Sequence, residues 1–179
     1  MKARTKKKID KVNRAIRILL IITLCFVVIT NFEAIAVNRV LEIYKSNIKY
    51  DENLSGIVNQ IKNSCLNYSN NSDYSEMVYK FCVYSKLENY MSKFKYEQVS
   101  AVDKYLFLNL EPSEIAKEMK GDCTKIAILF ASLVKTANIT DEVYLMLQDE
   151  HVCVMTKLKE NYLFYNCFDN MPFEYLKRV

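Results

Sequence analysis

The first strong pattern along the chain is a run of apolar residues that follows a basic segment. Ile18 to Ile29 reads ILLIITLCFVVI without a charge, and apolar positions continue less regularly to Val37. A helix that spans a membrane needs roughly 20 mostly apolar residues. The pattern therefore predicts a transmembrane signal anchor over residues 16–37. The alternative is a signal peptide that is cleaved after Ala36, at an A-x-A sequence.

Apolar residues recur at helical spacing between residues 38 and 110. One stripe runs from Leu54 to Cys65, a second from Met77 to Phe94, and a third, shorter one from Val99 to Leu110. Each stripe predicts a helix with one buried face. The polar sequence NYSNNS separates the first two stripes and predicts a loop.

The hydrophobic period changes in the last third of the chain. Residues 123–137, CTKIAILFASLVKTA, carry apolar side chains at helical spacing and predict a helix whose N-cap is Asp122. Three runs with strand character follow, at residues 143–147, 151–156 and 162–168. We expect an α+β protein in which this helix packs on a small antiparallel sheet.

These patterns divide the chain into three parts. Residues 1–37 hold the basic tail and the anchor, residues 38–110 form a helical region, and residues 111–179 form the core. Residues 38–179 are expected to fold as one unit, because a chain of 179 residues suffices for about one domain. With only two glycines and two prolines, a helix-rich domain is favoured over a sandwich with many tight turns.

Charge is concentrated at the N-terminus. The net charge of the chain is +4, but residues 1–17 hold eight basic residues against one acidic residue, which gives +7 there and −3 for the remainder. A basic segment before an apolar run sets membrane orientation. We therefore expect a single-pass membrane protein with a cytoplasmic N-terminus and an extracytoplasmic folded domain. The acidic remainder gives no support for nucleic-acid binding.

Three residues of the core carry candidate chemistry. Cys123 opens the predicted helix, and helix N-termini lower the pKa of a thiol and offer backbone N–H groups to an oxyanion. His151, the only histidine, begins a strand, and Asp169 follows the next strand. An aspartate beside a histidine holds the imidazole in one tautomer and favours the imidazolium. Each residue alone has an ordinary structural explanation, but the three together predict a Cys-His-Asp catalytic triad.

The proximity of His151 and Asp169 depends on the register of a hairpin. A three-residue loop at Lys159–Asn161 pairs residue 158 with residue 162, which sets His151 opposite Asp169 with Cβ atoms about 5 Å apart. A two-residue loop instead puts the two side chains on opposite faces of the sheet.

This core resembles that of the transglutaminase-like superfamily. The resemblance is carried by Gly121-Asp122-Cys123 before a helix, His151 at the start of a strand and Asp169 after the next strand. The segment PSEIAKEMKGDCTKIAILFASLVKTANI is similar to that family's nucleophile segment, and about residues 111–170 are covered. The resemblance implies a papain-like fold in which Cys123 is the nucleophile, His151 the general base and acid, and Asp169 the orienting residue. The chain has no Trp, so an oxyanion contribution from a Trp side chain, as in many members, is excluded.

On this basis we expect a membrane-anchored cysteine enzyme that acts on amide bonds of peptides or of peptide-containing surface polymers. Hydrolysis, as by a cysteine peptidase or amidase, is expected over cross-linking acyl transfer, because a small open site excludes water poorly. The alternatives are an inactive transglutaminase-like binding module and a structural or assembly protein at the membrane.

The expected partners are a peptide or protein substrate and the membrane, through residues 16–37. No cofactor is expected, and one histidine without a C-x-x-C sequence gives no metal site.

Four of the six cysteines form two candidate pairs, Cys65–Cys82 and Cys153–Cys167. The second pair follows from the three-residue hairpin loop. An extracytoplasmic domain permits disulfides, but we expect buried thiols at both pairs.

Overall fold

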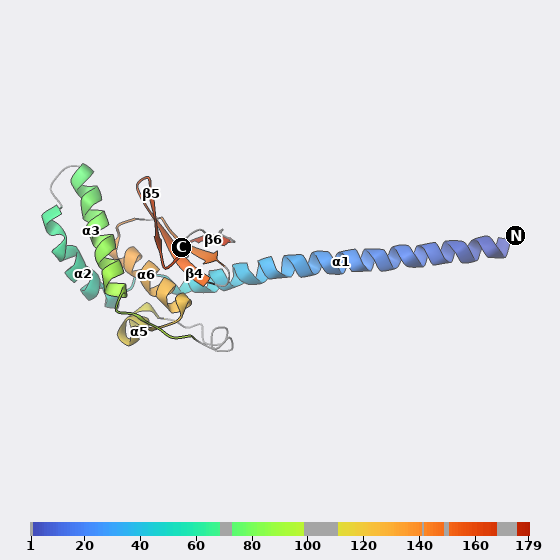
Figure 1. The fold of residues 1–179 in the computed structure, drawn as a ribbon, viewed down its shortest axis with the longest axis horizontal. Helices are drawn as coiled ribbons and strands as arrows, with labels where there is room; N and C mark the ends of the chain where they lie inside the picture. Colours follow the sequence, from blue (N-terminus) through green and yellow to red (C-terminus); the bar gives the residue numbers. More distant parts are fainter. Residues whose placement is uncertain (1, 69–72, 99–110, 141, 149–150, 168–174) are drawn as a thin grey trace. The chain divides into compact units, whose positions relative to one another are not determined.

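The computed structural model describes residues 2–68, 73–98, 111–140, 142–148, 151–167 and 175–179. The chain divides into two compact units, Met1–Val40 and Leu41–Val179. The first unit is helical, and the second combines helices with two sheets (Figure 1).

The N-terminal helix α1 (Lys2–Asn47) carries the apolar run that was predicted to span a membrane. Within the described residues, no helix combines the length and the apolar character that a membrane crossing requires. The predicted transmembrane helix over residues 16–37 is therefore wrong, and so is the single-pass membrane localisation that depended on it. The physical reason lies in the sequence. The uncharged run Ile18–Ile29 covers about 18 Å of helix, against roughly 30 Å of hydrocarbon, and Asn31 and Glu33 interrupt its continuation.

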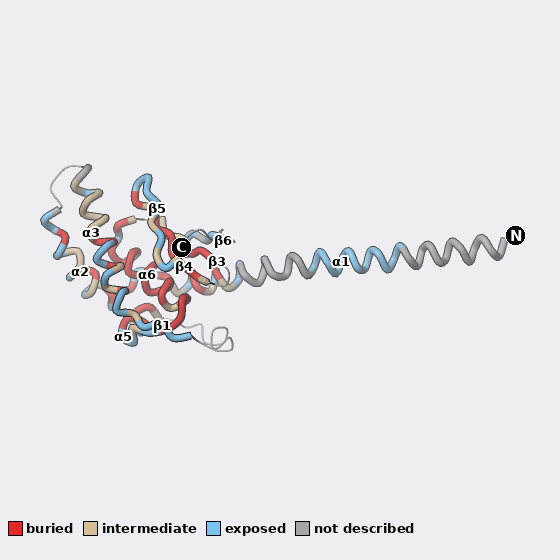
Figure 2. Tube along the Cα trace, viewed as in Figure 1, coloured by how far each residue is buried: buried red, intermediate tan, exposed pale blue. Residues whose placement is uncertain are grey.

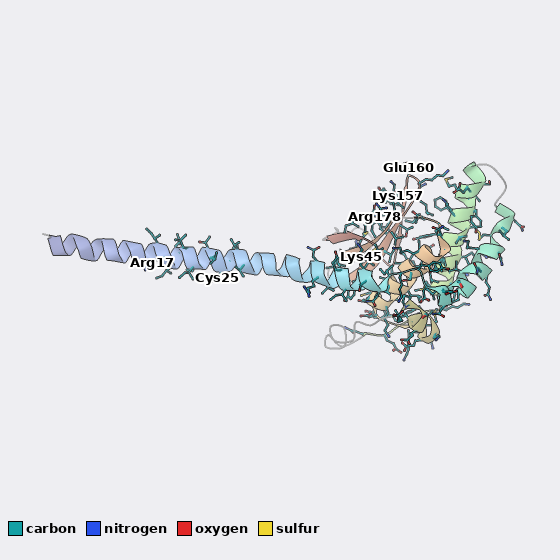
Figure 3. All side chains as sticks on the ribbon, turned by 180° about the vertical axis from the view of Figure 1, so that it is seen from behind. Arg17, Cys25, Lys45, Lys157, Glu160 and Arg178 are labelled. Atoms are coloured by element: carbon teal, nitrogen blue, oxygen red, sulfur yellow. A yellow bond between two sulfur atoms is a disulfide. The ribbon has the colours of Figure 1, made fainter. Side chains whose placement is uncertain are left out.

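Residues 16–28 of α1 are exposed on every side of the helix (Figure 2). Figure 3 shows the side chains of Arg17 and Cys25 projecting from this part of α1. Cys25 is exposed and takes part in no disulfide. It is therefore a suitable reference thiol for measurements of cysteine reactivity.

Two helices of the second unit follow the predicted apolar stripes. Helix α2 (Ser55–Ser64) buries Val58, and α3 (Asp73–Met91) buries Leu87. The disulfide Cys65–Cys82 links the end of α2 to the middle of α3, with Cα atoms 5.9 Å apart. The third stripe, residues 99–110, lies outside the described residues. The described residues also include the short helices η1 (Glu52–Leu54), η2 (Leu66–Tyr68) and α5 (Pro112–Glu118).

Within the described ranges, the main sheet has four strands in the order β5-β4-β3-β6, and every neighbouring pair is antiparallel. The antiparallel sheet and three of its strands agree with the prediction, whereas β6 was not predicted. A second sheet pairs β1 with β2 in parallel. The strands are β1 (Lys95–Tyr96), β2 (Lys120–Gly121), β3 (Val143–Gln148), β4 (His151–Leu158), β5 (Asn161–Tyr165) and β6 (Tyr175–Arg178).

Helix α6 (Cys123–Ala137) is the centre of the second unit. Thirteen of its fifteen residues are buried (Figure 2). The helix packs against β4 and β3 on one side and against α2, α3 and α5 on the others. Because it is covered on several sides, its apolar residues extend well beyond a single stripe.

Alternation along β4 assigns its side chains to two faces of the sheet. Val154 pairs with Tyr165, whose ring stacks on Phe130 of α6 with centroids 3.9 Å apart, so these side chains mark the face toward α6. Cys153 points to the other face, where it belongs to a buried apolar cluster with Met146. The helix thus covers one face, and a smaller cluster lies on the other.

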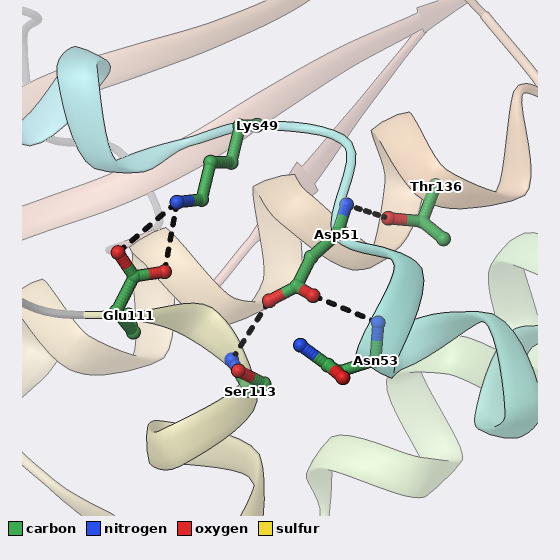
Figure 4. A network of polar contacts seen from close by, with 6 residues as sticks. All are labelled: Lys49, Asp51, Asn53, Glu111, Ser113 and Thr136. Atoms are coloured by element: carbon green, nitrogen blue, oxygen red, sulfur yellow. Dashed lines mark hydrogen bonds and ion pairs between the residues drawn. The ribbon is translucent and has the colours of Figure 1, made fainter.

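The buried residue Asp51 ties three helix ends together through its carboxylate and its backbone N–H (Figure 4). Oδ1 of Asp51 accepts a hydrogen bond from the backbone N–H of Asn53 at 2.9 Å, and Oδ2 accepts one from the backbone N–H of Ser113 at 3.2 Å. The backbone N–H of Asp51 donates to Oγ1 of Thr136 at 3.2 Å. Asp51 thereby joins η1 to the start of α5 and to the last turn of α6.

Candidate active site

The turn before α6 is shaped by three consecutive residues. Gly121 has a φ of 147°, a conformation open to glycine. Oδ1 of Asp122 accepts a hydrogen bond from the backbone N–H of Lys125 at 3.1 Å, which confirms Asp122 as the N-cap of α6. Cys123 is the first helical residue, is 5% exposed and belongs to neither disulfide. Its thiol therefore lies at a helix N-terminus, where backbone N–H groups lack intrahelical partners.

The turn before α6 is also held by the short parallel pairing of β1 with β2. Tyr96 of β1 pairs with Gly121 of β2, and the backbone N–H of Glu97 donates to the backbone oxygen of Gly121 at 2.8 Å. A Cβ on Gly121 would lie 2.4 Å from Cδ of Lys125. The ammonium of Lys125 forms an ion pair with Glu118 at 3.1 Å. A side chain at position 121 would therefore displace Lys125 from this arrangement.

The connection from α6 to the sheet fixes the direction of the helix. Asn138 ends α6 in the left-handed conformation, with a φ of 52°. Oγ1 of Thr140 then donates to the backbone oxygen of Lys157 at 2.6 Å, near the end of β4. This bond holds the end of α6 near the end of β4, and the two elements pack against each other, so we infer that α6 and β4 run in the same direction. Their first residues, Cys123 and His151, therefore lie at the same end of this layer.

The stacking of Phe130 on Tyr165 sets the level of the two elements, because Tyr165 pairs with Val154. Cys123 precedes Phe130 by seven residues, which is about 10 Å of helix. His151 precedes Val154 by three residues, which is about 10 Å of strand. The start of α6 and the start of β4 thus lie at about the same distance from the contact between Phe130 and Tyr165.

The imidazole of His151 is oriented by a backbone carbonyl. Its Nε2 atom lies 2.5 Å from the backbone oxygen of Asn166. A carbonyl oxygen only accepts hydrogen bonds, so Nε2 carries the proton. In the neutral ring the lone pair is then on Nδ1, which is the nitrogen able to act as a base. Asp169, the predicted orienting residue, lies outside the described residues.

The hairpin of β4 and β5 has a shorter loop than predicted. Leu158 pairs with Asn161, so the loop consists of Lys159 and Glu160, with a φ of 54° at Lys159. The predicted three-residue loop, with residue 158 opposite residue 162, is therefore wrong. Because side chains alternate along a strand, this shift of one residue moves each side chain of β5 to the face opposite the predicted one.

One extra residue directly after β5 sets Cys167 opposite Cys153, as the predicted register did. Tyr165 pairs with Val154, but Cys167 is joined to Cys153 by a disulfide with Cα atoms 5.1 Å apart. Asn166 is the residue in excess, with a φ of 55°, as in a β-bulge. Both candidate disulfides are therefore formed, and the expectation of buried thiols is wrong.

The pleat places the thiol and the imidazole on different faces of the sheet. Cys123 lies about two turns before Phe130, so it shares the side of α6 that faces the sheet. His151 alternates with Val152 and shares the face of Cys153, so its Cβ points away from α6. The structure brings both residues to one end of the sheet. Contact between them requires the imidazole to reach around that end.

Reasoning from the sequence missed the role of Asn166. The signal available was an asparagine directly after an aromatic strand, because asparagine adopts the left-handed conformation more readily than most non-glycine residues. Within the part of the chain that the structure describes, no group of three or more His, Cys, Asp or Glu side chains could hold a metal ion.

Comparison with known proteins adds no relative. No protein-family model matches the chain, and neither a curated protein nor a solved structure matches it. The resemblance to the transglutaminase-like superfamily therefore stays a prediction from the residues around Cys123, His151 and Asp169.

Proposed function

We propose that this protein is a transglutaminase-like thiol enzyme in which Cys123 and His151 act on an amide bond of a peptide or protein. The observation that supports the proposal is the common end of α6 and β4. A capped helix N-terminus presents the one buried thiol of the chain at the same end of the sheet as its only imidazole. In this proposal Asp169 acts by its negative charge, which favours the imidazolium, because Nε2 of His151 already donates to the Asn166 carbonyl.

The first chemical step forms an acyl-thioester. Nδ1 of His151 takes the proton of the Cys123 thiol, and the sulfur attacks the carbonyl carbon of the amide. Backbone N–H groups of the first turn of α6 offer hydrogen bonds to the oxyanion that develops. The C–N bond then breaks, and the imidazolium returns its proton to the leaving amine.

The second step releases the acyl group. Water loses a proton to Nδ1 of His151 and attacks the thioester carbonyl. The C–S bond then breaks, which releases a carboxylic acid, and the imidazolium returns its proton to the sulfur to restore the thiol. An amine in place of water would give a new amide. Hydrolysis is the proposed outcome, because the short chain between Cys123 and His151 offers few loops that could exclude water.

A second candidate, a non-catalytic binding or assembly module that keeps the same fold, is favoured by two observations. Cys123 is only 5% exposed, and the Cβ of His151 points to the face of the sheet away from α6. Both features are ordinary for residues that pack rather than react. The two candidates differ in whether the Cys123 sulfur accepts an acyl group.

Acetylation by p-nitrophenyl acetate tests the proposal directly. We would use Cys25→Ala, in which Cys123 is the sole thiol because the other four cysteines form disulfides. The enzyme predicts a burst of p-nitrophenolate and one acetyl group on Cys123, seen by mass spectrometry. Replacement of His151 by Ala should slow the burst by on the order of 10²- to 10⁴-fold, the usual contribution of a general base. Acetylation confined to lysines, equal in Cys123→Ala, would instead favour the binding module.

A further inference from the structure

The residues around His151 form a closed circuit, that is, a ring of connected residues. Two contacts between β4 and the chain after β5 close it: the Cys153–Cys167 disulfide and a hydrogen bond of His151. Cys153 lies two residues after His151 on β4. Its sulfur is bonded to Cys167, which directly follows Asn166. The backbone oxygen of Asn166 lies 2.5 Å from Nε2 of His151 and closes the circuit. The imidazole is thus connected to the disulfide through only a few bonds on either side.

The bulge at Asn166 is what allows the circuit to close. In the register of the hairpin, Leu158 pairs with Asn161, and Cys167 would face Val152 rather than Cys153. Side chains at those two positions would lie on the face toward α6, away from Cys153. The extra residue, with a φ of 55°, turns Cys167 to the Cys153 face. The disulfide in turn holds this left-handed residue in place, because it fixes the chain immediately after it.

We propose that the Cys153–Cys167 disulfide, acting through the backbone carbonyl of Asn166, positions the imidazole of His151 and keeps its proton on Nε2. Asn166 and the two cysteines are positioning residues, since they act through His151. The effect on the ring is independent of the reaction. Only its consequence for catalysis rests on the proposed function, because Nδ1 must face the thiol in the correct tautomer to accept its proton.

Nuclear magnetic resonance can observe this positioning without any substrate. His151 is the only histidine of the chain, so a single imidazole N–H resonance in the ¹⁵N-labelled protein requires no assignment. A hydrogen bond from Nε2 to a carbonyl protects this proton from exchange with water and shifts its resonance downfield. We expect this signal in the native protein at a pH where the imidazole is neutral and carries one N–H. Its ¹⁵N shift should be typical of a protonated Nε2.

The first comparison removes one disulfide at a time. In Cys153→Ala/Cys167→Ala the protected N–H signal should be lost, because the Asn166 carbonyl is released. The matched control is Cys65→Ala/Cys82→Ala, which removes a disulfide between α2 and α3 and should keep the signal. Far-UV circular dichroism checks that both variants are folded. A folded Cys153→Ala/Cys167→Ala protein with an unchanged signal would overturn the proposal.

A second comparison decides the question if the first variant fails to fold. Asn166→Gly keeps the left-handed conformation accessible and the carbonyl in place, so the N–H signal should remain. Asn166→Val places a β-branched side chain at a φ of 55°, which is strongly disfavoured. The signal should then be lost although the cysteines are unchanged. Equal signals in Asn166→Gly and Asn166→Val would contradict the proposal.

The same variants separate the positioning from the catalysis. If both ideas hold, loss of the N–H signal accompanies a fall in the rate of Cys123 acetylation on the order of 10- to 100-fold, as expected for a displaced catalytic group. If the signal is lost while Cys123 acetylation is absent or unaffected in all variants, the positioning stands and the proposed enzyme fails.

Discussion

The ring of Phe130 on α6 stacks on the ring of Tyr165 at the end of β5, with centroids 3.9 Å apart and an angle of 20° between the planes. A third ring, Tyr84 of α3, meets Phe130 edge-on with centroids 5.4 Å apart. This contact joins the central helix, the hairpin and the helical layer. It also sets Cys123 and His151 level with each other, because both lie about 10 Å from it along their elements.

The two tyrosines of this cluster predict a loss of stability at alkaline pH. Burial, with a smaller contribution from the Glu88 carboxylate, raises the pKa of Tyr165 from 10.0 to about 12 and also raises the pKa of Tyr84. The folded state therefore holds these protons more tightly than the unfolded state does. As the pH rises through 10 toward 12, the unfolded chain binds fewer protons, so the free energy of unfolding falls. Below pH 10 the contribution is fully present.

Urea unfolding between pH 8 and about pH 11, a window set by the ordinary tyrosine pKa of about 10, measures this effect. The native protein should become progressively less stable across the upper half of the window. Tyr84→Phe/Tyr165→Phe should flatten the dependence, whereas Tyr50→Phe, at an exposed position, should not. A double variant with the same alkaline slope as the native protein would show that other groups are responsible.

The two glycines of the chain predict opposite effects of the same substitution. Gly121→Ala introduces a side chain at a φ of 147° and within 2.4 Å of Lys125, so it should destabilise the protein by about 1–3 kcal/mol. Gly56 lies inside α2 with nothing within 4 Å of an added Cβ. Gly56→Ala should stabilise the protein by up to about 1 kcal/mol. Chemical denaturation of both variants is the measurement, and equal changes would refute this account of the turn before α6.

The N-cap of α6 predicts a difference between two replacements of Asp122. Asp122→Ala removes the acceptor of the Lys125 N–H and should cost about 1 kcal/mol of stability. Asp122→Asn keeps a side-chain oxygen that can cap the helix and should cost little. If the cap also fixes the first turn, Asp122→Ala should slow acetylation of Cys123 more than Asp122→Asn does. Similar stability in the two variants would show that the hydrogen bond does not cap the helix in solution.

The sequence predicted the elements that follow from local chemistry. These elements are helix α6, its N-cap Asp122 and the strands after it. They were predictable because an acidic cap, a helical period and runs of β-branched and aromatic residues each act locally. The membrane prediction failed because the apolar run Ile18–Ile29 is too short and its continuation is interrupted by Asn31 and Glu33.

The hairpin register was not predictable from the same signals. A two-residue loop is usually marked by Asn-Gly or Asp-Gly, but here Lys159 adopts the positive φ. The bulge at Asn166 depends on the disulfide beyond it, and the disulfide depends on the bulge. Such mutual dependence arises only in the assembled sheet. The face on which each side chain of β5 lies therefore had to be observed.

Competitive alkylation of the two thiols tests the central claim most directly. In the native full chain at neutral pH, the thiols that iodoacetamide can modify belong to Cys25, which is exposed, and Cys123, which is only 5% exposed. If Cys123 is a nucleophile activated by His151, it should be alkylated faster than Cys25 despite its burial, and His151→Gln should reverse the order. Rapid modification of Cys25 in the native protein, with Cys123 protected until the chain is denatured, would contradict the account.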